Sequence, residues 1–159
     1  MPPLKGIDRG LSGRALKALE ESGHGRRIAV VDASYDIPRR AQVIDYRGET
    51  SQQALLGILR LVSPENETVT LMAPDDGDQG VLDERGPFCD EASTAMDNDF
   101  GYFHIDARKK DDDGDEVGFY NFVDGKDTLY FRTVDRLPYA CASFIVEHMQ
   151  VSAGSSEEQ

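Results

Sequence analysis

A histidine and an aspartate stand on either side of a short apolar segment near the start of the sequence. His24 lies between Gly23 and Gly25, and Asp32 follows the four apolar residues 28–31. A histidine whose pKa is about 6.5 can donate and accept a proton at neutral pH, and a carboxylate can orient it or bind a substrate hydroxyl. The pair predicts proton transfer at a strand end, although a turn histidine and a capping aspartate fit the spacing about equally well.

Tyr139 and the two cysteines are further candidates for chemistry. Tyr139 follows the segment 135–138, and its phenol could donate a hydrogen bond to a polar ligand, although most tyrosines simply pack. Cys89 could be a nucleophile, but no neighbouring residue marks its thiol as activated. Cys89 and Cys141 are too far apart in sequence for a metal-binding CxxC pair, and they imply no disulfide framework.

The acidic segment 111–116 invites a test for calcium binding. With Gly114 placed at the glycine of an EF-hand loop, the first and last ligand positions fall on Lys109 and Tyr120, and neither supplies a carboxylate. A solvated charge run is therefore the favoured interpretation. The sequence also contains no P-loop, dinucleotide-binding glycine motif, zinc-ligand spacing or nucleophile elbow, so we expect cofactor-free chemistry.

Length and charge limit the classes of protein to consider. A chain of 159 residues is about one domain long. Its 17 basic and 30 acidic side chains leave a net charge of −13, which argues against nucleic acid and anionic membranes as partners. No apolar segment has the length of a signal peptide core or a membrane span, so a cytoplasmic protein is expected.

Hydrophobic periodicity predicts the elements that must position these residues. A helix over about 12–22, with Ser12 as N-cap and Gly23 as a left-handed C-terminal cap, leads into a buried strand at 28–31. A strand at 42–46 precedes a helix that Thr50 or Ser51 caps and Pro64 ends. A third strand follows at 68–72, so the first half has α/β character.

The second half gives a weaker pattern. Residues 74–99 read as a loop with at most one helix, 100–105 as a possible strand, and 106–116 as a charged loop or insertion. The segment 117–132 fits either a hairpin or a short helix followed by a strand at 128–132. A last strand is expected at 142–146, and the acidic tail 151–159 is expected to fray.

The order of these motifs resembles the RbsD/FucU family, which is typified by D-ribose pyranase and L-fucose mutarotase. The segment 16–25 followed by 28–33 is similar to the family's amino-terminal signature. Residues 43–72 resemble its second strand, helix and third strand, and residues 133–139 resemble its carboxyl-terminal sugar-binding segment. Roughly the first half and the last thirty residues carry the resemblance.

The resemblance implies a set of site residues. It makes His24 the catalytic acid/base, Asp32 a catalytic and substrate-binding carboxylate, and Tyr139 a catalytic and ligand-binding phenol. Ala140 and Cys141 would complete the sugar-binding segment. Cys141 departs from the family, because an asparagine usually grips the sugar at this position and a thiol is a poor hydrogen-bonding substitute.

A basic contact to the sugar is also expected from the family. It aligns with Arg108, although His104 and Glu116 are alternatives that depend on where the charged insertion is placed.

The resemblance also implies a fold, an assembly and an activity. The expected fold is a single RbsD-like three-layer α/β/α domain over 1–150, with a mixed, largely parallel sheet and a helix at 117–124. Family members form ring-shaped, decamer-like homo-oligomers with pockets near subunit interfaces. The implied activity is interconversion of the ring forms of a free monosaccharide without a cofactor. A sugar-binding protein without catalysis, or an isomerase of another small metabolite, remains an alternative.

Overall fold

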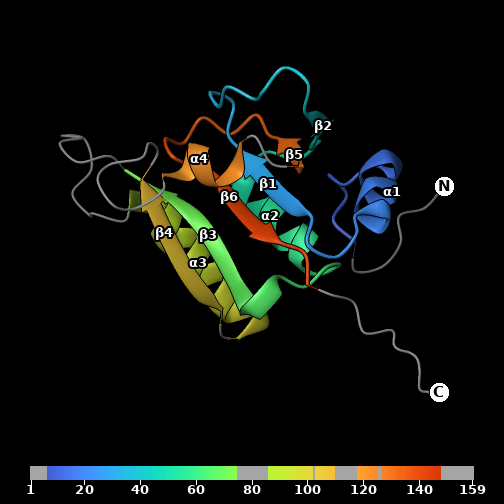
Figure 1. The fold of residues 1–159 in the computed structure, drawn as a ribbon. Helices are drawn as coiled ribbons and strands as arrows, with labels where there is room; N and C mark the ends of the chain where they lie inside the picture. Colours follow the sequence, from blue (N-terminus) through green and yellow to red (C-terminus); the bar gives the residue numbers. More distant parts are fainter. Residues whose placement is uncertain (1–6, 75–85, 102, 110–117, 125–126, 148–159) are drawn as a thin grey trace.

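The computed structural model describes residues 7–74, 86–101, 103–109, 118–124 and 127–147 (Figure 1). The predictions for 110–117 and for the tail 151–159 lie outside the described residues. The described strands form a six-stranded sheet in the order β2-β5-β1-β6-β3-β4. Their bounds are β1 Arg27–Val31, β2 Gln42–Asp45, β3 Thr68–Ala73, β4 His104–Lys109, β5 Thr128–Arg132 and β6 Ala142–Ile145.

One strand runs against the direction of the others. β1, β2 and β5 are mutually parallel, as are β3 and β4, whereas β6 is antiparallel to both β1 and β3. Because β6 runs antiparallel to both neighbours, β1 and β3 point the same way. The sheet is therefore mixed and largely parallel, as predicted.

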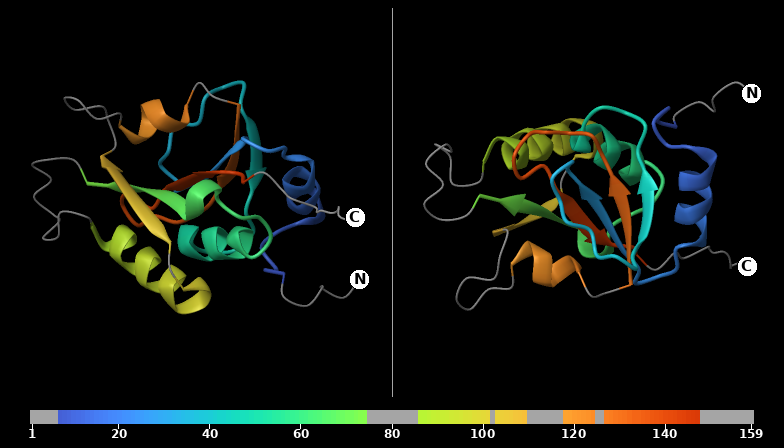
Figure 2. Two further views of the ribbon diagram at one scale, coloured as in Figure 1. Left: turned by 60° about the horizontal axis from the view of Figure 1, so that its bottom comes forward. Right: turned by 90° about the horizontal axis from the view of Figure 1, so that it is seen from above.

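Helices cover both faces of the sheet (Figure 2). α1 (Gly13–Glu21), α2 (Ser51–Leu59) and α3 (Gly86–Phe100) share one core with the face that carries Ile28 and Val30. α4 (Phe119–Val123) packs on the opposite face with Ala29 and Val31. Because residues 28–31 are almost inaccessible on both faces, β1 reads as a continuous apolar run. The three-layer architecture is confirmed.

The helix starts follow the local sequence. The Ser12 hydroxyl accepts a hydrogen bond from the Ala15 amide at 3.1 Å, which caps α1. Thr50, rather than Ser51, caps α2, and Thr50 forms a reciprocal capping box with Gln53. Thr50 and Gln53 thereby satisfy amide groups that the first turn leaves without helical partners.

The predicted left-handed cap at Gly23 is wrong. α1 ends at Ser22 in an extended conformation, and the Ser22 amide donates back to the Leu19 carbonyl. The left-handed conformation falls on Gly25 instead, at φ +84°, in the turn that leads into β1. Glycine adopts this conformation without the steric penalty that a Cβ would bring.

One prediction for the middle of the chain is confirmed and another needs correction. The one helix allowed within residues 74–99 is present as a helix of 15 residues over 86–100. Its buried side is carried by Phe88, Ala92 and Met96 at spacings of four. The strand expected at 100–105 instead spans 104–109, so the charged loop expected from 106 cannot begin before 110. β4 tolerates Asp106 and Arg108 because an edge strand need not bury both faces.

In the described parts of 117–132, a helix is followed by a strand, as the family resemblance implied. α4 precedes β5, and β5 pairs in parallel with β1 and β2, so a hairpin is excluded.

Candidate functional site

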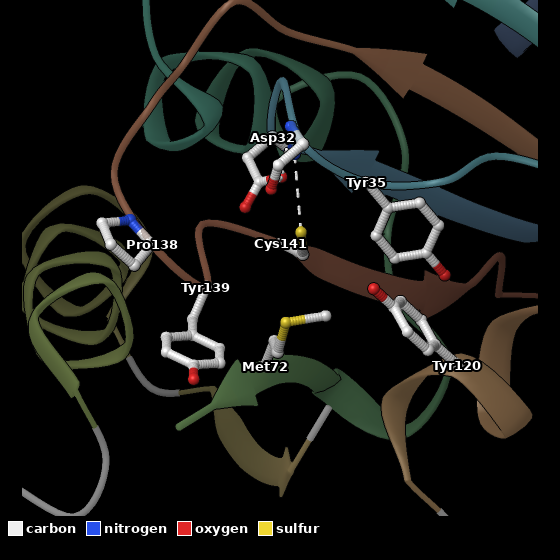
Figure 3. Close-up of a pocket in the computed structure, with 8 residues that line it drawn as sticks. Asp32, Tyr35, Met72, Tyr120, Pro138, Tyr139 and Cys141 are labelled. Carbon is white, nitrogen blue, oxygen red and sulfur yellow. Dashed lines mark hydrogen bonds between the residues drawn. The ribbon is translucent and has the colours of Figure 1, made fainter. Parts of the chain in front are cut away.

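A pocket of roughly 210 Å³ opens at the carboxyl edge of the sheet (Figure 3). It lies where the loop after β1, the end of β3, α4 and the loop before β6 meet. Its lining combines a carboxylate, hydroxyls, two sulfur atoms and aromatic rings: Asp32, Ser34, Tyr35, Met72, Tyr120, Pro138, Tyr139 and Cys141. A small, partly apolar hollow with a few converging polar groups is the usual form of a small-molecule site.

The sheet topology explains why these segments converge. β1 and β3 point the same way and are separated by β6, which begins at the edge where they end. The Met72 amide donates to the Cys141 carbonyl at 2.9 Å, which ties the end of β3 to the start of β6. In open α/β sheets, ligands bind in the crevice outside the carboxyl ends of the strands, as this pocket does.

Asp32 is a fixed carboxylate at the end of β1. The residue is only 5% exposed. Its Oδ1 accepts hydrogen bonds from the Ser34 amide at 3.0 Å and the Ser34 hydroxyl at 2.9 Å. Both of these bonds end on Oδ1, so Ser34 does not use Oδ2. A buried carboxylate that is held in place by its own loop is well suited to accept hydrogen bonds from a ligand.

Cys141 forms the floor of the pocket beside Asp32. Its Sγ accepts a hydrogen bond from the Asp32 amide at 3.4 Å, and the residue is 1% exposed. Burial, followed by the negative charge of Asp32, raises the pKa of the Cys141 thiol well above its ordinary value. The thiol therefore stays protonated at neutral pH and serves as a neutral wall rather than a nucleophile.

Tyr139 enters the pocket from a strained backbone. Its φ is 62°, in the left-handed region that side chains with a Cβ seldom occupy. The Cys141 amide donates to the Tyr139 carbonyl at 2.9 Å, which closes a tight turn before β6. Strain of this kind persists only where surrounding contacts enforce it, and it is common at ligand sites.

Asp135 makes several of the contacts that hold the Tyr139 loop in this conformation. Its Oδ1 accepts from the Leu137 amide and its Oδ2 accepts from the Ser51 amide at the start of α2, both at 2.9 Å. Its carbonyl accepts from the Ala33 amide at 2.9 Å, directly after Asp32. One residue thus fixes the loop that carries Tyr139, the loop after β1 and the first turn of α2.

Tyr35 and Tyr120 form the wall opposite Tyr139, and the sequence analysis did not identify either of them. Their rings meet edge to face with centroids 5.0 Å apart, and Figure 3 shows the two rings next to each other on the side of the pocket away from Tyr139. The Tyr35 hydroxyl donates to Asp124 Oδ1 at 2.8 Å. One indication of Tyr35 was present in the sequence, namely its position three residues after Asp32. Tyr120 fell in a segment whose secondary structure was ambiguous.

His24 does not lie in this pocket within a single chain. It is exposed in the turn between α1 and β1, at the amino end of the strand whose carboxyl end leads to Asp32. A strand of five residues spans roughly 13 Å at about 3.3 Å per residue, so the two side chains lie at opposite edges of the sheet. The structure brings Asp32, Tyr139 and Cys141 together and leaves His24 apart.

The remaining predicted site residues lie outside the pocket lining. Ala140 is fully buried, and its side chain belongs to the core on the α2 side. Arg108 lies on β4, where its Nε donates to Asp106 Oδ2 at 2.6 Å and its guanidinium lies 4.2 Å from the Phe122 ring centroid. It lines a separate hollow with Thr70 and Asp106.

The alternatives to Arg108 do not enter the pocket lining either. His104 is exposed at the start of β4, and Glu116 lies outside the described residues.

Among the described residues, no group of three or more histidine, cysteine, aspartate or glutamate side chains could hold a metal ion. None of the described helices is long and apolar enough to cross a membrane.

Comparison with solved structures identifies the fold. Neither a family model nor a curated relative matches the sequence. A fucose mutarotase from Streptococcus pneumoniae, solved in complex with L-fucose, has a TM-score of 0.71 and 23% identity over 91% of this chain and 98% of that one. FucU from Bifidobacterium longum gives a TM-score of 0.72 and 21% identity over 91% and 99%.

A ribose-bound structure shares the fold at lower similarity. RbsD from Bacillus subtilis, complexed with D-ribose, gives a TM-score of 0.59 and 16% identity over 87% of this chain and 95% of that one. The predicted RbsD-like fold is therefore confirmed, and the similarity extends over nearly the full length of the compared proteins.

Proposed function

We propose that this chain is a member of the RbsD/FucU family and that its pocket binds a free monosaccharide, whose ring forms the protein interconverts. The observation that carries the proposal is the buried, fixed carboxylate of Asp32 among phenols at the carboxyl edge of this particular fold. L-fucose and D-ribose, the ligands of the two sugar-bound structures that share the fold, are the first substrates to test.

The lining suits a sugar for two reasons. Asp32 can accept hydrogen bonds from two neighbouring sugar hydroxyls, and the phenols of Tyr120 and Tyr139 can donate or accept. Met72 and the Tyr35 ring offer apolar surface to the C–H face of a pyranose. The combination holds a polyol in one orientation without demanding a charge on the ligand.

The reaction needs one proton removed and one supplied. Loss of the anomeric hydroxyl proton and protonation of the ring oxygen open the hemiacetal to a free aldehyde, and closure on the other face reverses the roles. Acid–base catalysis of this kind typically contributes about 10²–10⁴-fold. The reaction is already fairly quick in water, so such an acceleration is sufficient.

The position of His24 implies that a second copy of the chain is needed. His24 and Asp32 lie at opposite edges of the sheet, so His24 can act on a sugar beside Asp32 only from a neighbouring subunit. The exposure of His24 supports such a role, and the ring-shaped homo-oligomer expected from the family would provide the neighbour. Asp32 and Tyr139 of one subunit and His24 of another would then form one site.

Saturation-transfer NMR of anomer exchange tests the proposal. We expect the wild-type protein to accelerate exchange of L-fucose or D-ribose, and Asp32→Asn and His24→Ala each to remove that acceleration. Asp45→Asn is the matched control, because Asp45 is exposed at the end of β2 and pairs with Arg132. Exchange at the wild-type rate in Asp32→Asn would exclude this pocket as the site.

Mixing the two inactive variants tests the shared site. If subunits exchange, about a quarter of the interfaces in a random mixture combine both unaltered groups, so activity should partly return. No recovery in a mixture shown to contain hybrid oligomers would place His24 outside the reaction.

Cys141 favours one alternative, a sugar-binding protein without catalysis. The buried, protonated thiol replaces an amide that would hydrogen-bond the sugar more strongly. Calorimetry that shows saturable sugar binding, together with no exchange acceleration by NMR, would select this alternative.

A further inference from the structure

α4 is too short to be stable by its own hydrogen bonds. It has five residues, and no side chain caps its amino terminus at Gly118. Isolated helices of this length do not form in water, so tertiary contacts must hold α4 in place. The position of Tyr120, which α4 carries into the pocket wall, therefore depends on those contacts.

Apolar burial fixes one side of α4. Phe119 and Val123 are fully buried against the sheet. The Thr128 hydroxyl donates to the Val123 carbonyl at 2.7 Å. These contacts hold the helix on the sheet through its buried side, and the half-buried Tyr120 lies on the side of the helix that faces the pocket.

A pair of phenols holds the end of the helix at Asp124. The hydroxyls of Tyr35 and Tyr130 both donate to Asp124 Oδ1, so one carboxylate oxygen joins the loop after β1 to the middle of β5. The Asp124 amide donates to the Tyr120 carbonyl at 2.7 Å. The backbone of Asp124 is thus hydrogen-bonded directly to the backbone of Tyr120, which lines the pocket.

The same cluster contacts Tyr120 a second time. The Tyr35 ring packs edge to face on the Tyr120 ring at 5.0 Å, and its hydroxyl binds Asp124. Tyr35 therefore fixes Tyr120 through its side chain and, by way of Asp124, through its backbone. Tyr130 is 1% exposed and does not line the pocket, so it acts indirectly, through Asp124 and through its ring contact with Tyr35, whose centroid lies 6.1 Å away.

We propose that Tyr35, Asp124 and Tyr130 form a positioning cluster that holds α4 and sets Tyr120 at the ligand. Its effect on ligand binding rests on the proposed function of the pocket. Asp124 and Tyr130 are positioning residues, because neither lines the site, whereas Tyr35 both positions Tyr120 and forms part of the wall.

Tyr130→Phe tests the cluster, and Tyr46→Phe is its matched control. Each substitution deletes one buried phenol that donates to a carboxylate, since Tyr46 donates to Asp8 Oδ2 at 2.8 Å away from the pocket. We expect similar losses of thermal stability from the two variants. Only Tyr130→Phe should weaken binding of L-fucose or D-ribose, by about three- to tenfold in calorimetry. This is less than the full contribution of one charge-assisted hydrogen bond, because the lost bond is not made to the ligand.

Hydrogen exchange provides a readout that does not need a ligand. The amides of Phe122 and Asp124 donate to the carbonyls of Gly118 and Tyr120 within α4. In Tyr130→Phe these two amides should exchange roughly tenfold faster than in the wild type, and in Tyr46→Phe they should not change. Tyr35→Phe combined with Tyr130→Phe should exceed the sum of the single effects, because Asp124 Oδ1 then loses both phenol donors.

The outcomes separate this inference from the proposed function. If the wild type binds neither sugar, the proposed function fails, and exchange in α4 decides the cluster's role in positioning the helix. Unchanged exchange of Phe122 and Asp124 in Tyr130→Phe would overturn the inference. Faster exchange together with unchanged sugar affinity would also overturn it, because α4 would then be held without any effect on the site.

Discussion

Replacing Asp135 by alanine should be one of the most destabilising single changes to a polar side chain near the pocket. The substitution removes the acceptors of two backbone amides, Leu137 and Ser51, both at 2.9 Å. A hydrogen bond to a charged group is worth about 1.5–3 kcal/mol. Because Asp135 is only half-buried, we discount the sum to about 2–4 kcal/mol of unfolding free energy.

Urea denaturation followed by far-UV circular dichroism measures this loss. For a chain of this size each kcal/mol shifts the melting temperature by about 2–4 °C, so the thermal midpoint should fall by roughly 5–15 °C. Asp45→Ala is the matched control, because Asp45 forms an exposed ion pair with Arg132 at 2.7 Å. An exposed pair contributes about 1 kcal/mol or less.

The comparison of the two variants can refute the reasoning. If Asp135→Ala and Asp45→Ala lose the same unfolding free energy, Asp135 does not hold the loop that carries Tyr139. A second check is Asp135→Asn, whose amide can replace one acceptor but not both, and which should fall between the wild type and Asp135→Ala.

Three further predictions follow from glycine conformation, thiol burial and phenol burial. Gly25→Ala should lose about 1–2 kcal/mol in urea denaturation because of its φ of +84°, whereas Gly13→Ala in the first turn of α1, with open space around it, should lose nothing or gain up to about 1 kcal/mol. The buried thiols of Cys89 and Cys141 should react with Ellman's reagent only as fast as the protein opens, so a rapid native-state reaction of either would contradict their burial. Burial and hydrogen bonding to carboxylates raise the pKa of the phenols of Tyr35, Tyr46 and Tyr130. The stability that these protonated phenols contribute is complete below pH about 10 and declines as the pH rises above it. Absorbance at 295 nm should accordingly show three of the six tyrosines ionising only as the protein unfolds, these three being Tyr35, Tyr46 and Tyr130.

Much of the fold could be predicted because buried strands and helix faces appear in the sequence as apolar runs and stripes. β1 and β3 are buried on both faces and appear as apolar runs, and the stripe of α2 shows which side faces the sheet. β4 was misplaced because an edge strand with one partly solvated face carries Asp106 and Arg108 among few apolar residues. The bounds of α3 were not predicted because small residues such as Cys89 and Ala92 fill part of its buried side.

The site could be predicted only in part, for a geometric reason. Asp32, Tyr139 and Cys141 were identified, and the structure places all three around one pocket. His24 precedes β1 and Asp32 follows it, so the rule that ligands gather at carboxyl ends of strands applies to Asp32 alone. Tyr120 could not be identified, because its place in the wall depends on contacts of α4 with distant strands that no local pattern reveals.

The place of β6 in the sheet has a consequence for synthesis on the ribosome. β6 follows the other five strands in the chain, yet it lies between β1 and β3. Until it emerges, β2, β5 and β1 can pair with one another, and β3 can pair with β4, but no other described strand joins the two groups. Because chains emerge at about 5–20 residues per second, the nascent protein must wait with two exposed interior strand edges, and a chaperone that shields such edges would raise its yield.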